Sequence, residues 1–155
     1  MFLIGLVLFI LVLDLGIKDT IEEADSASFP KKLEGTDGRI LLHKNHNDGF
    51  AFGFYRNKPE LVKAVPFMMA SAVGGIFLWL NAQKGHKAEK LSFALVLGGA
   101  LSNLYDRLYR GYVVDYFSIQ WGRLKKVVLN LGDLFIFLGA GLLLVSEVIR
   151  SFKDH

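Results

Sequence analysis

Residues 127–149 read VVLNLGDLFIFLGAGLLLVSEVI, an apolar run that contains two polar residues, Asn130 and Asp133, near its beginning. A helix needs about 20 mostly apolar residues to cross a lipid bilayer, and this run is long enough. An ionised carboxylate in hydrocarbon costs on the order of 3 kcal/mol or more. The run therefore predicts a membrane-spanning helix in which Asp133 has a polar partner.

Three further segments have the same apolar character, at residues 2–18, 61–82 and 91–108. The chain is 52% hydrophobic with a mean hydropathy of +0.37, and its apolar residues occur in blocks. We therefore expect a membrane all-α protein with four transmembrane helices and a single domain over residues 1–155. The first segment has no Lys or Arg before its apolar core, and Asp14 interrupts the end of that core. We expect a retained helix there and not a cleaved signal peptide.

The composition excludes several classes of function. With no cysteine, the chain contains neither disulfides nor thiolate metal sites. The sequence pI of about 9.1 reflects three excess positive charges, which suit an anionic membrane surface. No basic patch with interleaved aromatic residues occurs, so we expect no nucleic acid partner.

Four spans place both termini on one side of the membrane. Basic residues in the 83–90 loop and at the C-terminus assign this side to the cytoplasm by the positive-inside rule: Lys84, Lys87, Lys90, Arg150 and Lys153. The 107–126 loop is also basic, which opposes this assignment. The extracytoplasmic segment is then about 19–60. Within it, residues 39–55 hold two apolar runs around HNDG, which predicts a short pair of strands at the membrane surface.

The unusual polar residues gather near the outer membrane interface. Asp133 lies six residues into the fourth segment, roughly 9 Å below its start. The connection between the third and fourth segments can fold back and bring Asp115 beside Asp133, because these two segments are antiparallel. The outer ends of the first and third segments contribute the remaining members of the group, which are Asp14, Lys18, Asn103, Asp106 and Arg107.

Two neighbouring carboxylates favour acid–base chemistry. They cannot both ionise comfortably, so the pair holds one proton and titrates as a unit. The ionised member can then take a proton from water while the other protonates a carbonyl oxygen, as in aspartic proteases. A structural role stays open at this point for each residue. Asp133 would be a carboxylate at a helix N-terminus, satisfied by Asn130, and Asp115 a loop acid paired with Arg107 or Arg110.

Other chemistry is less favoured. His43, His46 and Asp48 have poor spacing for a metal site. Ser102 and Ser118 have no histidine at the outer ends of the helices to activate them, and a Ser–Lys pair with Lys18 is a minor alternative. The glycine pairs at 98–99 and 139–141 favour close helix packing.

Four motifs resemble those of the bacterial lipoprotein signal peptidases (signal peptidase II), in the same order. DLGIK at 14–18 is similar to the family's D-x-x-x-K, and NDGFAFG at 47–53 to its N-x-G-x-A-F block. GGALSNLYDRLYRGYVVDYF at 98–117 resembles G-N-x-x-D-R…G-x-V-x-D-F, and NLGD at 130–133 resembles N-x-A-D.

The resemblance implies an intramembrane aspartic endopeptidase that cleaves diacylglyceryl-modified prolipoproteins just before the lipidated cysteine. Asp115 and Asp133 would be the catalytic pair. The residues implied to bind substrate or support the site are Asn47, Gly49, Asn103, Arg107, Asn130, Asp14 and Lys18. A small extracytoplasmic β-cradle between the first two helices would clamp the substrate.

The resemblance also implies a multi-pass protein of the bacterial inner membrane, with both termini cytoplasmic and the active site near the extracytoplasmic face. We expect no metal and no cofactor, lipidated prolipoproteins and membrane lipids as partners, and a monomer. Departures from the family pattern, at Phe50, Ser102, Gly132 and Leu134, leave the pair intact and bear on substrate range. The alternatives are a non-enzymatic four-helix membrane partner and a small ion- or proton-translocating subunit.

Overall fold

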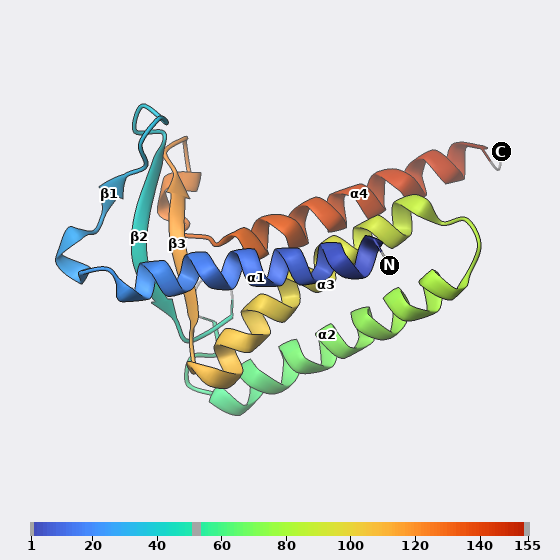
Figure 1. The fold of residues 1–155 in the computed structure, drawn as a ribbon, viewed down its shortest axis with the longest axis horizontal. Coiled ribbons are helices and arrows are strands. Elements are labelled where there is room, and N and C mark those ends of the chain that lie inside the picture. Colours follow the sequence, from blue (N-terminus) through green and yellow to red (C-terminus); the bar gives the residue numbers. More distant parts are fainter. Residues whose placement is uncertain (1, 51–53, 154–155) are drawn as a thin grey trace.

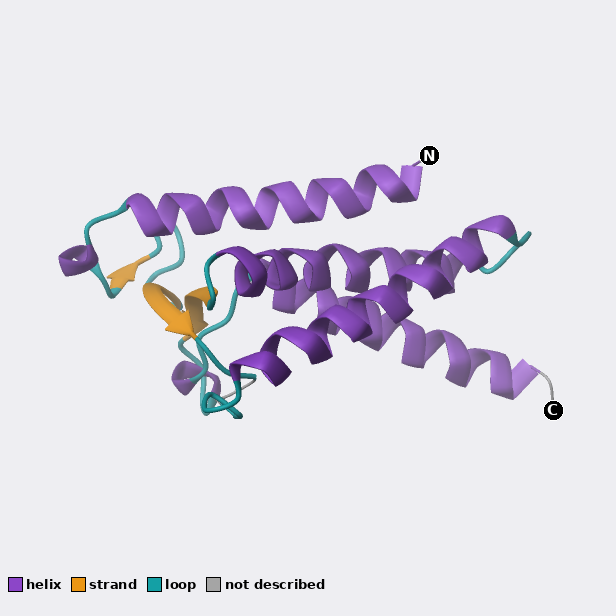
Figure 2. Ribbon diagram, turned by 90° about the horizontal axis from the view of Figure 1, so that it is seen from below, coloured by secondary structure: helices purple, strands orange, loops and turns teal. Residues whose placement is uncertain are grey.

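The computed structural model describes residues 2–50 and 54–153, which form four long helices and a small sheet (Figure 1). The sheet lies at one end of the helices and both chain ends lie toward the other (Figures 1 and 2). The helices are α1 (Phe2–Glu23), α2 (Pro59–Ala82), α3 (Lys87–Tyr109) and α4 (Leu131–Lys153). The four predicted helical segments are therefore present.

Two of these helices are long and apolar enough to cross a membrane. They are α2 and the Leu131–Phe152 stretch of α4, with mean hydropathies of 1.8 and 1.9. Only 17% and 11% of the residues in these stretches are buried, which suits helices surrounded by lipid. In contrast, α1 and α3 bury charged and polar side chains against each other, including Asp14, Lys18 and Asp106.

Close helix packing depends on two glycines. A Cβ atom added at Gly99 in α3 would lie 2.2 Å from the carbonyl oxygen of Gly132 in α4, and one at Gly139 would lie 2.6 Å from the Ser92 carbonyl oxygen. Backbone atoms cannot move aside easily, so only glycine allows this approach of α3 and α4. The predicted packing role is confirmed for these positions and for Gly98. It is wrong for Gly141, whose added Cβ would meet nothing within 4 Å.

The sheet has three antiparallel strands in the order β1 (Lys31–Lys32), β2 (Ile40–Asn47) and β3 (Val113–Ile119). Asn45 pairs with Asp115, and the register shifts between Leu42 and Asn45. All residues of β3 from Val113 to Ser118 are buried, so this strand forms part of the core at the sheet end of the molecule.

The described residues do not form the predicted strand pair around HNDG. The first apolar run forms a strand, and residues 54–57 form a turn. Residues 51–53, which include the end of the NDGFAFG motif, lie outside the described part of the chain. Besides the short β1, β2 pairs with β3, which follows α3, so the sheet is not confined to the segment between the first two helices. The β3 strand is rich in β-branched and aromatic residues and is almost fully buried, which favours this pairing.

The start of the fourth helix also differs from the prediction. Val127 to Asn130 precede α4, and Leu129 exchanges backbone hydrogen bonds with Phe117 in β3. The helix begins at Leu131, so Asp133 lies in its first turn. The prediction that Asp133 lies six residues into the fourth helix is therefore wrong. Leu129 pairs with β3 and so does not join the helix, which begins two residues later.

Candidate active site

Asp115 and Asp133 are joined by the side chain of Asn130. The Nδ2 atom of Asn130 donates to Asp115 Oδ1 at 2.9 Å, and its Oδ1 atom accepts from the Asp133 backbone N–H at 2.9 Å. The long connection between α3 and α4 folds back as β3, which brings the two carboxylates to one site. The predicted proximity of Asp115 and Asp133 is confirmed.

Asn130 and Asp133 also form a reciprocal cap at the start of α4. Asp133 Oδ2 accepts from the Asn130 backbone N–H at 3.2 Å, which completes the exchange. Such a capping box satisfies two of the backbone donors that a helix N-terminus leaves free. The structural role considered for Asp133, as a carboxylate at a helix N-terminus satisfied by Asn130, is thus present in the structure. It uses only Oδ2 of the carboxyl group, so Oδ1 can bind other groups.

Each carboxylate accepts a further hydrogen bond from an amide side chain. Asn47 Nδ2 donates to Asp115 Oδ2 at 3.2 Å, and Asn103 Nδ2 donates to Asp133 Oδ1 at 2.8 Å. The Gly49 backbone N–H donates to Asn47 Oδ1 at 3.2 Å and holds that amide in place. Within the described residues, the partners of Asp115 are amides, so the alternative pairing with Arg107 or Arg110 is wrong.

Burial is the main cause that raises the pKa of Asp115, and the negative charge of Asp133 adds to it. The two amide donors oppose this shift, and the resulting pKa is about 7. Asp115 can therefore hold a proton near neutral pH. A carboxylic acid beside a second carboxyl group is the arrangement that general acid–base catalysis requires.

Both aspartates line a cavity of about 580 Å³. One part of its wall is polar, with Asn47, Asn103 and Arg107. Another part is apolar and comes from the segment before α4 and from α4 itself: Leu124, Val127, Val128, Leu129 and Phe137. The cavity can therefore accept a ligand that is polar on one side and apolar on the other.

Arg107 extends along the polar wall. Its Nη1 and Nη2 atoms donate to the backbone carbonyl oxygens of Asn103 and Gly49 at 3.2 and 3.3 Å. Its Nε atom is buried and has no hydrogen-bond partner among the described residues. This arginine therefore links α3 to the segment after β2, and its guanidinium lines the cavity, where it can bind an oxygen of a ligand.

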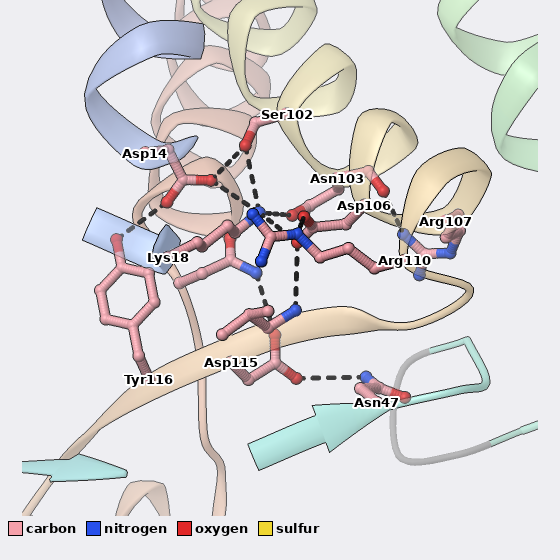
Figure 3. A network of polar contacts seen from close by, with 12 residues as sticks. Asp14, Lys18, Asn47, Ser102, Asn103, Asp106, Arg107, Arg110, Asp115 and Tyr116 are labelled. Carbon is pink, nitrogen blue, oxygen red and sulfur yellow. Dashed lines mark hydrogen bonds and ion pairs between the residues drawn. The ribbon is translucent and has the colours of Figure 1, made fainter. Parts of the chain in front are cut away.

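A buried ion cluster of Asp14, Lys18 and Asp106 lies near Asp115 (Figure 3). Lys18 Nζ is 2.8 Å from Asp14 Oδ2 and 3.0 Å from Asp106 Oδ2, and all three side chains are fully buried. Lys18 also donates to Asn103 Oδ1 at 2.9 Å, and Asn103 in turn donates to Asp133. The predicted support of the site by Asp14 and Lys18 thus has a direct path through Asn103.

The family model described as signal peptidase (SPase) II, of peptidase family A8, matches residues 6–149. The chain belongs to the signal peptidase II family. Known relatives include lipoprotein signal peptidases from Haemophilus influenzae (35% identity) and Pasteurella multocida (37% identity), each aligned over 111 residues. These alignments cover 70% of this chain but only 63% and 65% of the two relatives. The lipoprotein signal peptidase of Brucella ovis is 33% identical over 118 residues, which is 75% of this chain and 72% of the relative.

Two solved structures share the fold of this signal peptidase II family member. Both are described as bacterial membrane enzymes. One has a TM-score of 0.83 at 17% identity and covers 99% of this chain and 91% of its own. The other has a TM-score of 0.77 at 18% identity, with coverages of 93% and 90%. The two apolar helices and this likeness agree with a membrane protein.

Some polar residues of this signal peptidase II chain were not predicted to have a role. Asp106 completes the ion cluster and also accepts from the Val114 backbone N–H at 3.1 Å. Ser102 donates to Asp14 Oδ2 at 2.6 Å, and the Tyr116 hydroxyl donates to Asp14 Oδ1 at 2.8 Å. Their signal in the sequence is weak, because a polar residue next to an apolar run is common at a membrane interface.

The serine alternatives can now be compared with the structure. Ser118 does have a histidine neighbour, which comes from strand β2 and not from the end of a helix: His43 Nε2 lies 2.7 Å from Ser118 Oγ. Ser118 is nevertheless fully buried, and burial lowers the pKa of His43. Ser102 lies 3.1 Å from Lys18 Nζ, but neither residue lines the cavity, and Lys18 is paired with two carboxylates. Neither serine is therefore placed as a nucleophile.

Proposed function

We propose that this chain is an intramembrane aspartic endopeptidase that removes signal peptides from diacylglyceryl-modified prolipoproteins, cleaving before the lipidated cysteine. Asp115 and Asp133 are the catalytic pair. One observation carries the proposal: the Asn130 side-chain amide links the carboxyl group of Asp115 in β3 to the backbone N–H of Asp133 in the first turn of α4, and both aspartates line a single cavity. Membership in the signal peptidase II family supports the class of substrate.

The reaction follows from a pair that shares one proton. The ionised carboxylate takes a proton from a water molecule, whose oxygen attacks the carbonyl carbon of the scissile peptide bond. The protonated carboxyl group gives its proton to the carbonyl oxygen, and a tetrahedral diol forms. Return of a proton to the amide nitrogen breaks the C–N bond and releases the signal peptide. The pKa of about 7 for Asp115 suits the proton-donating step.

The cavity walls suit a lipidated peptide. Arg107 lines the cavity, and its guanidinium can donate to a backbone carbonyl oxygen or to an ester oxygen of the substrate. The apolar wall formed by Val127, Val128, Leu129 and Phe137 can contact acyl chains or the apolar end of the signal peptide. Asn47, Gly49 and Asn103 hold the polar side of the site and contact Arg107 or the catalytic pair.

The proposed orientation has four membrane-crossing helices with both termini in the cytoplasm of a bacterium. The sheet and the catalytic pair then lie near the extracytoplasmic face of the inner membrane. Aromatic residues support an interface at the sheet end, because Tyr55, Tyr109 and Trp121 are strongly exposed there. Lys84, Lys87 and Arg150 at the opposite end support the cytoplasmic assignment. The partners are lipidated prolipoprotein and membrane lipid, and the functional unit is a monomer over residues 1–155.

The test is cleavage of a diacylglyceryl-prolipoprotein by purified protein in detergent micelles, followed by the release of the signal peptide. Asp115→Asn and Asp133→Asn should each lower kcat by roughly 10³-fold or more, because each removes one half of a unit that acts together. Asp37→Asn is the matched control, since Asp37 lies in a turn remote from the cavity.

Two results would contradict the proposal. If the wild-type protein does not cleave the substrate, the alternatives of a non-enzymatic partner or an ion-translocating subunit are favoured. If either Asp115→Asn or Asp133→Asn retains wild-type turnover, the assignment of the catalytic pair is wrong. Circular dichroism of each variant in micelles verifies that it is folded.

A further inference from the structure

Tyr116 connects the ion cluster to the helix that carries Asp133. Its hydroxyl lies 2.8 Å from Asp14 Oδ1 and accepts from the Leu131 backbone N–H at 2.9 Å (Figure 3). The side chain is 3% exposed. Tyr116 directly follows Asp115 in β3, and successive side chains of a strand point to opposite faces. One strand therefore holds Asp115 on the cavity face and reaches α4 from its other face.

The direction of each hydrogen bond is determined. A tyrosine hydroxyl has a single proton, and because it accepts from the Leu131 N–H, that proton is donated to Asp14. The other oxygen of Asp14 accepts from Ser102 at 2.6 Å and is 2.8 Å from Lys18 Nζ. Burial raises the pKa of Tyr116, so the hydroxyl remains protonated. Asp14 is thus a fixed, fully occupied acceptor.

The Leu131 N–H is one of the backbone donors that have no partner inside α4. Asn130 caps the N–H of Asp133, whereas the N–H of Leu131 depends on Tyr116 from a different element. The hydroxyl therefore fixes the first turn of α4 against β3. Since Asp115 belongs to β3 and Asp133 to that turn, this contact acts together with the Leu129–Phe117 and Asn130–Asp115 hydrogen bonds in setting the separation of the two carboxyl groups.

We propose that Tyr116 is a positioning residue that sets the geometry of the Asp115–Asp133 pair, with Asp14 as its anchor. The inference rests on the proposed peptidase function. Tyr116 does not touch the substrate, because it is absent from the cavity wall. Its effect is on the shared proton and the attacking water, which both depend on the distance between the carboxyl groups.

The test compares Tyr116→Phe with Tyr112→Phe. Tyr112 has the same side chain, and its hydroxyl donates to Glu22 at 3.3 Å, away from the ion cluster. A displacement of about 1 Å in a catalytic geometry can cost 10²-fold, so Tyr116→Phe should lower kcat by roughly 10- to 100-fold. KM should remain within about twofold, since no substrate contact is lost. Tyr112→Phe should leave both constants unchanged.

A second variant distinguishes positioning from folding. p-Aminophenylalanine at position 116 can still donate to Asp14 but is a poorer acceptor for the Leu131 N–H. It should restore part of the lost kcat at unchanged KM. If Tyr116→Phe is not recovered as a folded protein, the p-aminophenylalanine variant is the only test. A lowered kcat with an unchanged KM then supports the inference, and a wild-type kcat overturns it.

The inference also fails if Tyr116→Phe is folded and keeps a kcat within about twofold of wild type, or if only KM changes. Cleavage by the wild-type protein in the same assay separates these outcomes from a failure of the proposed function. If the proposed function is wrong, neither the wild-type protein nor any variant releases a signal peptide.

Discussion

Asn130 and Asp133 cap each other at the start of α4, through backbone-to-side-chain hydrogen bonds of 2.9 and 3.2 Å. The Nδ2 atom of the Asn130 amide donates to Asp115 Oδ1 at 2.9 Å. A single side chain thus caps the helix at the Asp133 backbone N–H and binds the carboxyl group of Asp115 in β3. Substitutions at Asn130 can separate these two roles.

Asn130→Ala removes both the cap and the bridge. The loss of an N-cap costs about 0.5–2 kcal/mol of unfolding free energy, so the melting temperature in detergent should fall together with kcat. Asn130→Ser keeps an oxygen that can cap the Asp133 N–H but has no amide donor for Asp115. We expect Asn130→Ser to recover most of the stability and little of the activity. A full recovery of kcat in Asn130→Ser would show that the bridge is dispensable.

Stability should depend on pH through Asp115. Its folded pKa of about 7 lies above the usual 3.8, first because the carboxyl group is buried and then because Asp133 is negative. Below about pH 4 the group is protonated in both states, and its stabilising effect is fully present. As the pH rises toward about 7, the unfolded chain ionises first, and stability falls by at most about 1.4 kcal/mol per pH unit.

Melting temperatures measured in detergent over this pH range test the effect. Asp115→Asn should abolish this part of the pH dependence, and Asp133→Asn should reduce it because one cause of the shift is removed. An unchanged pH dependence in Asp115→Asn would assign the effect to other groups. The same ionisation should lower kcat above about pH 7, since the proton-donating carboxyl group is lost.

Gly99→Ala should separate α3 from α4. The added methyl group would lie 2.2 Å from the Gly132 carbonyl oxygen, and overpacking of this kind costs about 1–3 kcal/mol or more. Because Gly132 directly precedes Asp133, kcat should fall as well. Gly141→Ala in α4 is the control, since its methyl group meets nothing within 4 Å. A melting temperature of Gly99→Ala equal to that of Gly141→Ala would contradict the close approach.

Lys18→Met should be strongly destabilising. It leaves Asp14 and Asp106 buried without their shared cation, and breaking a buried ion pair typically costs about 3–5 kcal/mol. Adding Asp14→Asn should recover part of this loss, because Asp106 still pairs with Arg110 whereas Asp14 has no second cation among the described residues. Arg150→Gln, in an exposed ion pair, should change the unfolding free energy by about 1 kcal/mol at most. Equal effects of Lys18→Met and Arg150→Gln in chemical unfolding would refute the role of the cluster.

The helices and the proximity of Asp115 and Asp133 could be predicted from the sequence. An apolar block of about 20 residues is typical of a membrane-spanning helix. Two antiparallel helices that are neighbours in the sequence have their connected ends on the same side, which brings Asp115 close to Asp133. The start of α4 could not be predicted in this way. Val127, Val128 and Leu129 are apolar and fit a helix or a strand equally well, and only the pairing of Leu129 with Phe117 decides between them.

The sheet was harder to predict for a related reason. The HNDG turn signal is local, whereas β2 pairs with β3 across a long stretch of chain that includes two helices. A local motif cannot reveal a partner so distant in sequence. The role of Tyr116 was missed on the same ground, because it depends on Asp14 and Leu131, which lie in two other parts of the chain.

The alternation of Asp115 and Tyr116 along β3 has a consequence for how the family can vary in length. A residue inserted between Arg110 and Asp115 would shift the strand by one position and exchange its two faces. The carboxyl group would then point at Asp14 and the phenol into the cavity. Insertions that a surface loop would accept should therefore be excluded from this short stretch, whereas the turn between β1 and β2 is free to change length.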